Sequence, residues 1–358
     1  MLTADLDREL AAALAASREL AGLAAARPPW AIRGTWRPAP DGRPAAYATA
    51  LPLRLARLAG CSPAQVAADL VGRLSAVPWI ESASPAGGHL TITVTPQALA
   101  ASAAAQSAAG PACADGTILT GTTTTVAPWP DLTAEPGWPQ AWQAHRAAVI
   151  GRLAQAAGAS VSASSYRERA TPPSRPLVTA GSPVGAATDY HGLHSVRYRL
   201  ARTLKGQVGR LADALKPDWA HAGLADPLYP VQQAHAVAAA DLRWARDLGL
   251  ARSDPREQLG TLLSSAEEQA MLGLLSFLPI RVAAAARRNR PDELPRYLER
   301  VAEHWQQCRL ARPALPFGGQ ASAQDPATAS ARLILAAAVQ AVLATGLALT
   351  GVTAADRL

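Results

Sequence analysis

The segment PLYPVQQAHAVAAADLRWARDLG, residues 227–249, indicates the fold of the C-terminal part of the chain. Pro227 opens it, Gly249 closes it, and the apolar and small residues between them recur at helical spacing, which marks one helix. Segments of the same kind fill the surrounding sequence, with turns marked by proline and glycine. They cover residues 193–215, 267–289, 293–311 and 331–350. About five helices in this length predict an all-α bundle over residues 191–358.

The first 100 residues mix two patterns and predict a small α+β module. Leucines at helical spacing predict a helix over residues 5–24, and residues 50–60 and 61–76 predict two more. The run HLTITVT, residues 89–95, alternates apolar residues with threonines, which is typical of a half-buried strand. We therefore expect helices on one face of an antiparallel sheet within residues 1–100.

Residues 101–190 predict a linker that contains a single helix. Residues 101–116 are rich in alanine and serine without an apolar period, and residues 163–189 are rich in proline, serine and glycine. Between these two stretches, Trp142 and Leu153 lie on one apolar stripe. This stripe predicts a helix over residues 139–157 that ends near Gly158.

One apolar segment raises the question of a membrane span. Residues 333–355 carry no charge over a length that could cross a bilayer. Gln340 lies near the middle and alanine supplies much of the bulk, so the composition favours a packed core helix over a span. The N-terminus shows no basic region followed by an apolar core, and we expect a cytoplasmic protein without a membrane partner.

Positive charge is the most uneven property of this sequence. The chain carries a net charge of +7, nearly all of its basic residues are arginine, and residues 196–312 hold 18 basic against 13 acidic residues. Guanidinium groups pair with phosphates and stack on bases, which favours an RNA or acidic partner. A genome that encodes arginine in place of lysine would explain the choice of arginine, although it would not explain where the excess lies.

Common catalytic and metal-binding motifs are absent from the sequence. There is no phosphate-binding P-loop, no dinucleotide fingerprint, no nucleophile elbow and no HExxH motif. The three cysteines, Cys61, Cys113 and Cys308, are widely separated and lack zinc spacing. We therefore predict neither a metal site nor a cofactor.

Several blocks of residues 194–358 resemble the helical, DALR-type anticodon-binding domain of arginyl-tRNA synthetases, and they follow in the same order. SVRYRLAR (195–202) is similar to the signature that opens that domain, and DPLYPVQQAHA (226–236) to its next helix. Residues 44–100 are similar to the N-terminal tRNA-binding module of the same family. The resemblance implies an α+β module at 1–100, a linker with a remnant helix of the catalytic domain at 101–190, and a helical anticodon-binding domain at 191–358.

The catalytic part of the family is what the sequence lacks. If RAAVIG (146–151) is similar to the end of the synthetase signature helix, Ala141 and Ala144 stand where the two histidines of H-x-G-H belong. A methyl group cannot stabilise a phosphate in the transition state. Only about 35 residues separate this helix from the helical domain. The resemblance therefore implies a pseudo-enzyme whose catalytic domain is deleted, and ATP would be a cofactor only if ligase activity survived.

The helical domain interleaves aromatic and basic residues, a composition that suits single-stranded RNA. We predict that it binds tRNA or another structured RNA, with no role for DNA. A protein-interaction scaffold derived from a synthetase is the alternative, and a residual arginine-tRNA ligase is a second one. The predicted RNA contacts are Arg197, Tyr198, Arg202, Tyr229, Gln232, Arg243, Trp305 and Arg309.

Overall fold

The structure is a computed structural model, and it describes residues 2–17, 20, 36–39, 42–162, 182–211, 226–250, 255–315 and 325–358. The N-terminal elements are α1 (Leu2–Ala16), β1 (Arg37–Pro38), β2 (Ala46–Thr49), α3 (Leu51–Ala59), α4 (Pro63–Leu74), β3 (Ile80–Ala86) and β4 (His89–Val94). The middle elements are α5 (Pro96–Ala109), η2 (Gly110–Ala114), β5 (Thr123–Thr124), α6 (Trp138–Ala156), β6 (Ser160–Val161) and α7 (Pro183–His191). The C-terminal elements are α8 (Leu193–Arg202), η3 (Lys205–Arg210), α10 (Tyr229–Asp247), η4 (Arg256–Gln258), α11 (Leu259–Leu262), α12 (Ala266–Ser276), α13 (Leu278–Arg287), α14 (Glu293–Ala311) and α15 (Pro326–Leu349).

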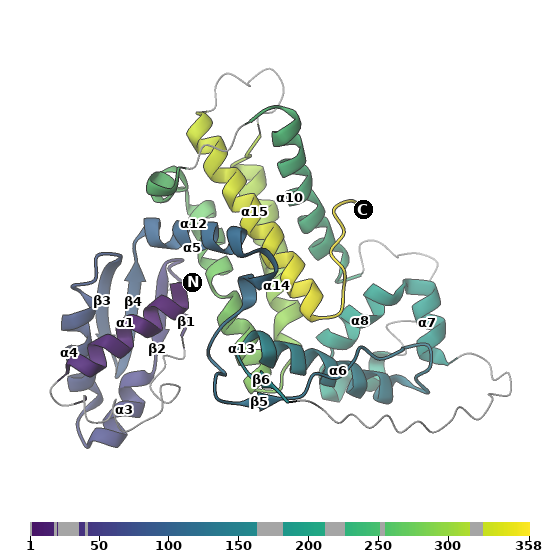
Figure 1. Ribbon diagram of the computed structural model, residues 1–358, viewed down its shortest axis with the longest axis horizontal. Helices are drawn as coiled ribbons and strands as arrows, with labels where there is room; N and C mark the ends of the chain where they lie inside the picture. Colours follow the sequence, from purple (N-terminus) through teal and green to yellow (C-terminus); the bar gives the residue numbers. More distant parts are fainter. Residues whose placement is uncertain are drawn as a thin grey trace.

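The N-terminal lobe is an antiparallel sheet with helices packed on it, as the sequence predicts. Its strand order is β1-β2-β4-β3, and Tyr47 of β2 pairs with Ile92 of β4. The central strand β4 is the predicted strand, and its side chains Leu90, Ile92 and Val94 are fully buried. Helices α3 and α4 pack against β4 and β3, and Ser62 starts α4 with a capping box. Figure 1 shows this lobe at the left of the molecule, joined to the helical part by α5.

Helix α5 corrects the prediction of a loop over residues 101–116. Thr95 caps the helix, Pro96 occupies its first turn, and the alanine-rich sequence then stays helical to Ala109 because alanine has the highest helix propensity. The helix packs against α12 and α15, and Gln106 donates a hydrogen bond to the carbonyl oxygen of Leu275 at 2.8 Å. An alanine-rich segment without an amphipathic pattern is thus part of the core of the protein.

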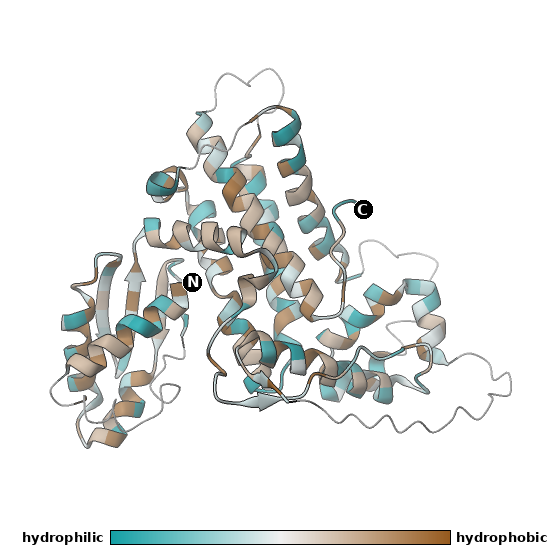
Figure 2. Ribbon diagram, in the orientation of Figure 1, coloured by the Kyte–Doolittle hydropathy of each residue, from teal (hydrophilic) through white to brown (hydrophobic). Residues whose placement is uncertain are grey.

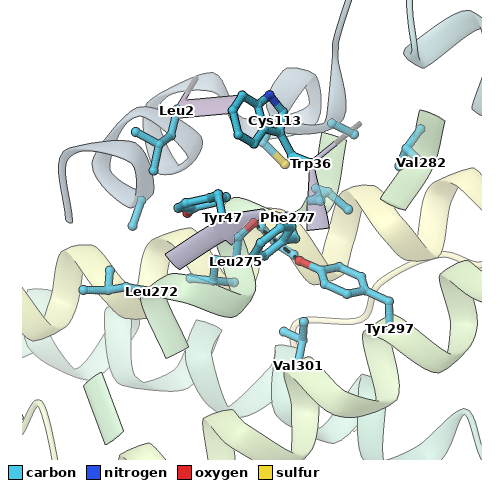
Figure 3. Packing of buried hydrophobic residues seen from close by; sticks show 14 of the residues in the cluster. Leu2, Trp36, Tyr47, Cys113, Leu272, Leu275, Phe277, Val282, Tyr297 and Val301 are labelled. Atoms are coloured by element: carbon cyan, nitrogen blue, oxygen red, sulfur yellow. Dashed lines mark hydrogen bonds between the residues drawn. The ribbon is translucent and has the colours of Figure 1, made fainter. Parts of the chain in front are cut away.

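The helical part surrounds α15, which packs against α5, α10 and α14. Its hydrophobic core continues into the N-terminal lobe. The ring of Tyr47 stacks on Phe277 with centroids 5.0 Å apart, and the two hydroxyl oxygens of Tyr47 and Ser276 lie 2.6 Å apart (Figure 3). The main chain at Pro44 of the N-terminal lobe approaches α12 closely at Gly273. A Cβ atom at this position would stand 2.3 Å from the carbonyl oxygen of Pro44, so only glycine fits there.

The predicted helix over residues 139–157 is α6, and it lies beside α7 and α8. The indole of Trp142 donates to the carbonyl oxygen of Thr203 at 3.0 Å. Helix α7 corrects the prediction that residues 183–189 are linker, because Ser182 caps it and Pro183 starts it. Residues 163–181 of that predicted linker lie outside the described residues.

Among the described residues, two segments are long and apolar enough to cross a membrane, residues 266–287 and α15. The first is divided between α12 and α13. Within each, 61% of the most apolar window is buried inside the protein, where the helices pack against their neighbours. Figure 2 shows the hydrophobic residues of α15 running through the middle of the helical part. Both segments thus have the environment of core helices, which pass the same test of length and composition.

Candidate nucleic-acid interface

The start of α6, where the family resemblance expects two histidines, is closed by apolar packing. Ala141 is fully buried and belongs to one cluster with Trp138 and Trp142, while Ala144 is half-buried. Neither methyl group can hold a proton or donate a hydrogen bond to a phosphate. In the described part of the chain, no group of three or more His, Cys, Asp or Glu side chains is placed to hold a metal ion.

Two predicted aromatic contacts are core residues, and their prediction as RNA contacts is wrong. Tyr198 is fully buried and donates a hydrogen bond to the carbonyl oxygen of Pro295 at 3.0 Å. Trp305 has only 3% of its surface exposed and packs in the same core. A buried ring has no free face on which a base could stack. Both lie on the faces of α8 and α14 that meet neighbouring helices, and this orientation is a tertiary property.

Two predicted arginines hold helices together through carboxylates. Arg202 donates to both oxygens of Glu299, with distances of 2.6 and 3.2 Å. Arg309 donates to both oxygens of Asp241, at 2.7 and 2.9 Å, and the Asp241 side chain is only 3% exposed. These hydrogen bonds raise the pKa of each guanidinium. The pairs tie α8 to α14 and α14 to α10, and in each the Nε and one Nη group of the arginine are engaged within the protein.

The remaining predicted residues lie on α8 and α10. Tyr229 and Gln232 are half-buried in the first turn of α10. Arg243, near the other end of that helix, donates to the main-chain oxygen of Asp356 at 3.0 Å. Arg197 of α8 is half-buried and donates to the main-chain oxygen of Gly351 at 3.2 Å. The predicted set therefore does not form one continuous face.

The exposed aromatic residue of this region is Trp244, which was not among the predicted contacts. Its surface is 53% exposed, and along the sequence it lies between Arg243 and the exposed Arg246. Together with Leu248 and Arg309 it lines a pocket of about 280 Å³. The signal in the sequence was the run RWAR at 243–246, where an aromatic residue alternates with guanidinium groups. We call Arg243, Trp244 and Arg246 the α10 surface.

A larger cleft of about 1080 Å³ opens between α10 and α15, and Arg243 and Arg246 of the α10 surface line it. Alanines of α15 form much of its wall, and Arg243 and Arg246 lie along α10. Arg197 and Trp129 line it as well, and the carboxylate of Asp356 is the acidic group among its lining residues. Cations thus outnumber anions around a volume that could hold a nucleotide.

The C-terminal part of the chain is similar to known proteins. Residues 231–358 match the family model described as the DALR anticodon binding domain. An arginine–tRNA ligase from Frankia alni is 37% identical over 133 residues, which make up 37% of this chain and 23% of the ligase. The matched part therefore covers about a quarter of that relative.

A solved structure supports the fold across the whole chain. The arginyl-tRNA synthetase of Thermus thermophilus superposes with a TM-score of 0.60 at 14% sequence identity, and the alignment covers 100% of each chain. At this identity the similarity shows the fold alone. It agrees with the predicted order of an α+β region followed by a helical domain.

Proposed function

We propose that this chain, which carries a DALR anticodon-binding domain related to that of arginyl-tRNA synthetases, is a cytoplasmic tRNA-binding protein that does not aminoacylate its RNA. The observation that carries this proposal is the exposed Trp244 on α10, a helix that also carries Arg243 and the exposed Arg246, inside the segment that matches the DALR model. An exposed indole offers a stacking face to an unpaired base, and the neighbouring guanidinium groups attract phosphates.

The absence of aminoacylation is supported by the start of α6. Ala141 and Ala144 occupy the positions that the resemblance assigns to the signature histidines, and Ala141 is buried in an apolar cluster. The site offers neither the hydrogen bonds nor the charge that would stabilise the transfer of a nucleotide. Arginine-dependent exchange between ATP and pyrophosphate tests this point, and we expect none. A rate above that of an Ala141→Trp variant would support the residual ligase instead.

RNA binding is tested by titrating the full chain with a tRNA transcript at several salt concentrations. We expect an affinity that falls with salt, and a loss of about 1–3 kcal/mol in binding free energy for Trp244→Ala, the range of one stacked base. Tyr190→Ala is the matched control, because Tyr190 is another exposed aromatic residue, 44% exposed, on α7. Equal affinity of both variants and the unaltered protein would contradict a role for the α10 surface.

A protein-interaction scaffold is the second candidate, and two exposed leucines favour it. Leu248 is 63% exposed and Leu310 is 80% exposed, and each shares a pocket with Arg309. Apolar side chains in such positions are common at protein interfaces. Capture of a synthetase that resists RNase, and is lost in a Leu248→Asp/Leu310→Asp double variant, would favour the scaffold over RNA binding.

A further inference from the structure

Two guanidinium groups share the indole ring of Trp129. Arg152 of α6 lies 3.8 Å from the ring centroid, and Arg197 of α8 lies 5.6 Å from it. Both side chains are half-buried. Helices that are separated in the sequence therefore bring two positive charges onto one aromatic residue. There, each charge raises the free-energy cost of burying the other.

Neither arginine is paired with a carboxylate within the described residues. Arg152 donates to the main-chain oxygens of Ala127 and Ala148, each at 2.8 Å, and Arg197 donates to that of Gly351. The Nε atom of Arg197 is buried without a hydrogen-bond partner in this part of the chain. Several other half-buried arginines of the helical part have carboxylate partners. They include Arg199 with Asp226, Arg309 with Asp241 and Arg332 with Glu268.

Two histidines beside the arginines also lack a balancing negative charge. His145 is fully buried, its ring stacks on Trp129 with centroids 5.4 Å apart, and neither ring nitrogen makes a hydrogen bond of good geometry. Burial, followed by the charges of Arg197 and Arg152, lowers its pKa to about 3. The Nδ1 atom of His194 is likewise buried without a partner among the described residues. The region thus combines positive charge with unused donor capacity.

Trp129 and Arg197 of this cluster line the cleft between α10 and α15, and Arg152 lies against the same indole ring. We propose that Arg197 and Arg152, seated on Trp129, form a binding site for a phosphoryl group. Guanidinium groups bind phosphate oxygens with paired, charge-assisted hydrogen bonds. A bound phosphoryl group would supply the negative charge that the two arginines lack. Both arginines precede residue 231, so this site lies outside the segment that matches the DALR model.

The test is isothermal titration of the full chain with inorganic phosphate. We expect saturable binding, and a loss of affinity of tenfold or more in Arg197→Met and in Arg152→Met. Arg146→Met is the matched control. Arg146 lies on the same helix, 5.3 Å from the ring centroid of Trp142, and donates to the main-chain oxygen of Asn289 at 2.7 Å, but it has no second guanidinium on its ring.

Absence of saturable phosphate binding, or equal affinity in all three variants, would overturn the proposal. If Arg197→Met does not fold by circular dichroism, Arg197→Lys replaces it, since a lysine keeps the charge but loses the paired donors and is expected to weaken binding less. A second series with a tRNA transcript identifies the source of the phosphoryl group. Parallel losses for phosphate and RNA indicate an RNA phosphodiester, whereas a loss for phosphate alone indicates a free phosphate or a nucleotide.

Discussion

Two groups of arginines in this protein have opposite chemistry. At the α10–α14 and α12–α15 interfaces, Arg309 and Arg332 donate to the buried carboxylates of Asp241 and Glu268. At the junction of α6 and α8, Arg152 and Arg197 meet only an indole and main-chain oxygens. The paired arginines hold the fold, whereas the unpaired ones keep a charge that an anion can use. Net charge alone does not distinguish the two kinds.

The largest effect is expected where a carboxylate is most buried. Arg332→Met would leave the Glu268 side chain, which is 2% exposed, without its guanidinium at 2.8 Å. We expect the free energy of unfolding in urea to fall by about 3 kcal/mol, the cost of an uncompensated buried charge. The double variant Arg332→Met/Glu268→Gln should recover part of this loss, because it removes both charges. A single variant as stable as the unaltered protein would remove the distinction between the two regions.

Arg309→Met should give a smaller loss at the second paired site. The Arg309 side chain is 25% exposed, so solvent reaches it more readily than Arg332, which is 17% exposed. We expect a loss of about 2 kcal/mol in the free energy of unfolding, because Asp241 stays buried but water can approach it. Urea denaturation measures this value. A loss larger than that of Arg332→Met would contradict the role given to exposure.

The unpaired region should respond to acid. The pKa of His145 is about 3 in the folded protein and near 6.5 when unfolded, so protons bind the unfolded state more strongly between these values. The folded state is therefore not penalised by His145 above pH 6.5, and it loses stability relative to the unfolded state as the pH falls from 6.5 toward 3. Between pH 6.5 and 5, we expect the unfolding free energy to fall by about 1 kcal/mol per pH unit more than in His145→Phe, because the unfolded ring is only half protonated at pH 6.5. Parallel slopes in the two proteins would show that His145 is charged when folded.

The smallest effect is expected at Arg197. Its replacement by methionine removes a hydrogen bond to Gly351, but it also relieves the burial of a charge next to Arg152. We expect a change within about 0.5 kcal/mol in the free energy of unfolding, because the two contributions offset each other. Thermal denaturation of Arg197→Met and Arg309→Met under the same conditions compares the stabilities of the two variants directly. A loss as large as that of Arg309→Met would mean that Arg197 is a structural residue.

Periodic segments of the sequence predicted their own structure well. The strand at residues 89–95 and the helices at 139–157 and 227–249 correspond to β4, α6 and α10, because apolar period and end signals agree there. The helices α5 and α7 were predicted as loop or linker. Both consist of small residues whose burial comes from neighbouring helices, so no amphipathic pattern marked them.

The candidate site was predicted less completely for a related reason. Basic residues interleaved with aromatic ones indicated the right helices, but they could not show which side of each helix faces water. Tyr198 and Trp305 proved to be buried, while Trp244 is exposed between two arginines. Whether an aromatic ring is exposed depends on which helix packs against it, and that helix comes from a distant part of the sequence.

The amphipathic helices, the presence of a sheet in the N-terminal lobe and the excess of arginine in the helical part all follow from local periodicity and composition of the sequence. Which arginines are neutralised depends instead on how the helices pack. Pairing of Arg309 with Asp241, and the meeting of Arg152 with Arg197 on Trp129, join residues between 23 and 68 positions apart. Charge interactions act over a few ångströms in space, so the packing of the helices, and not their order along the chain, decides them.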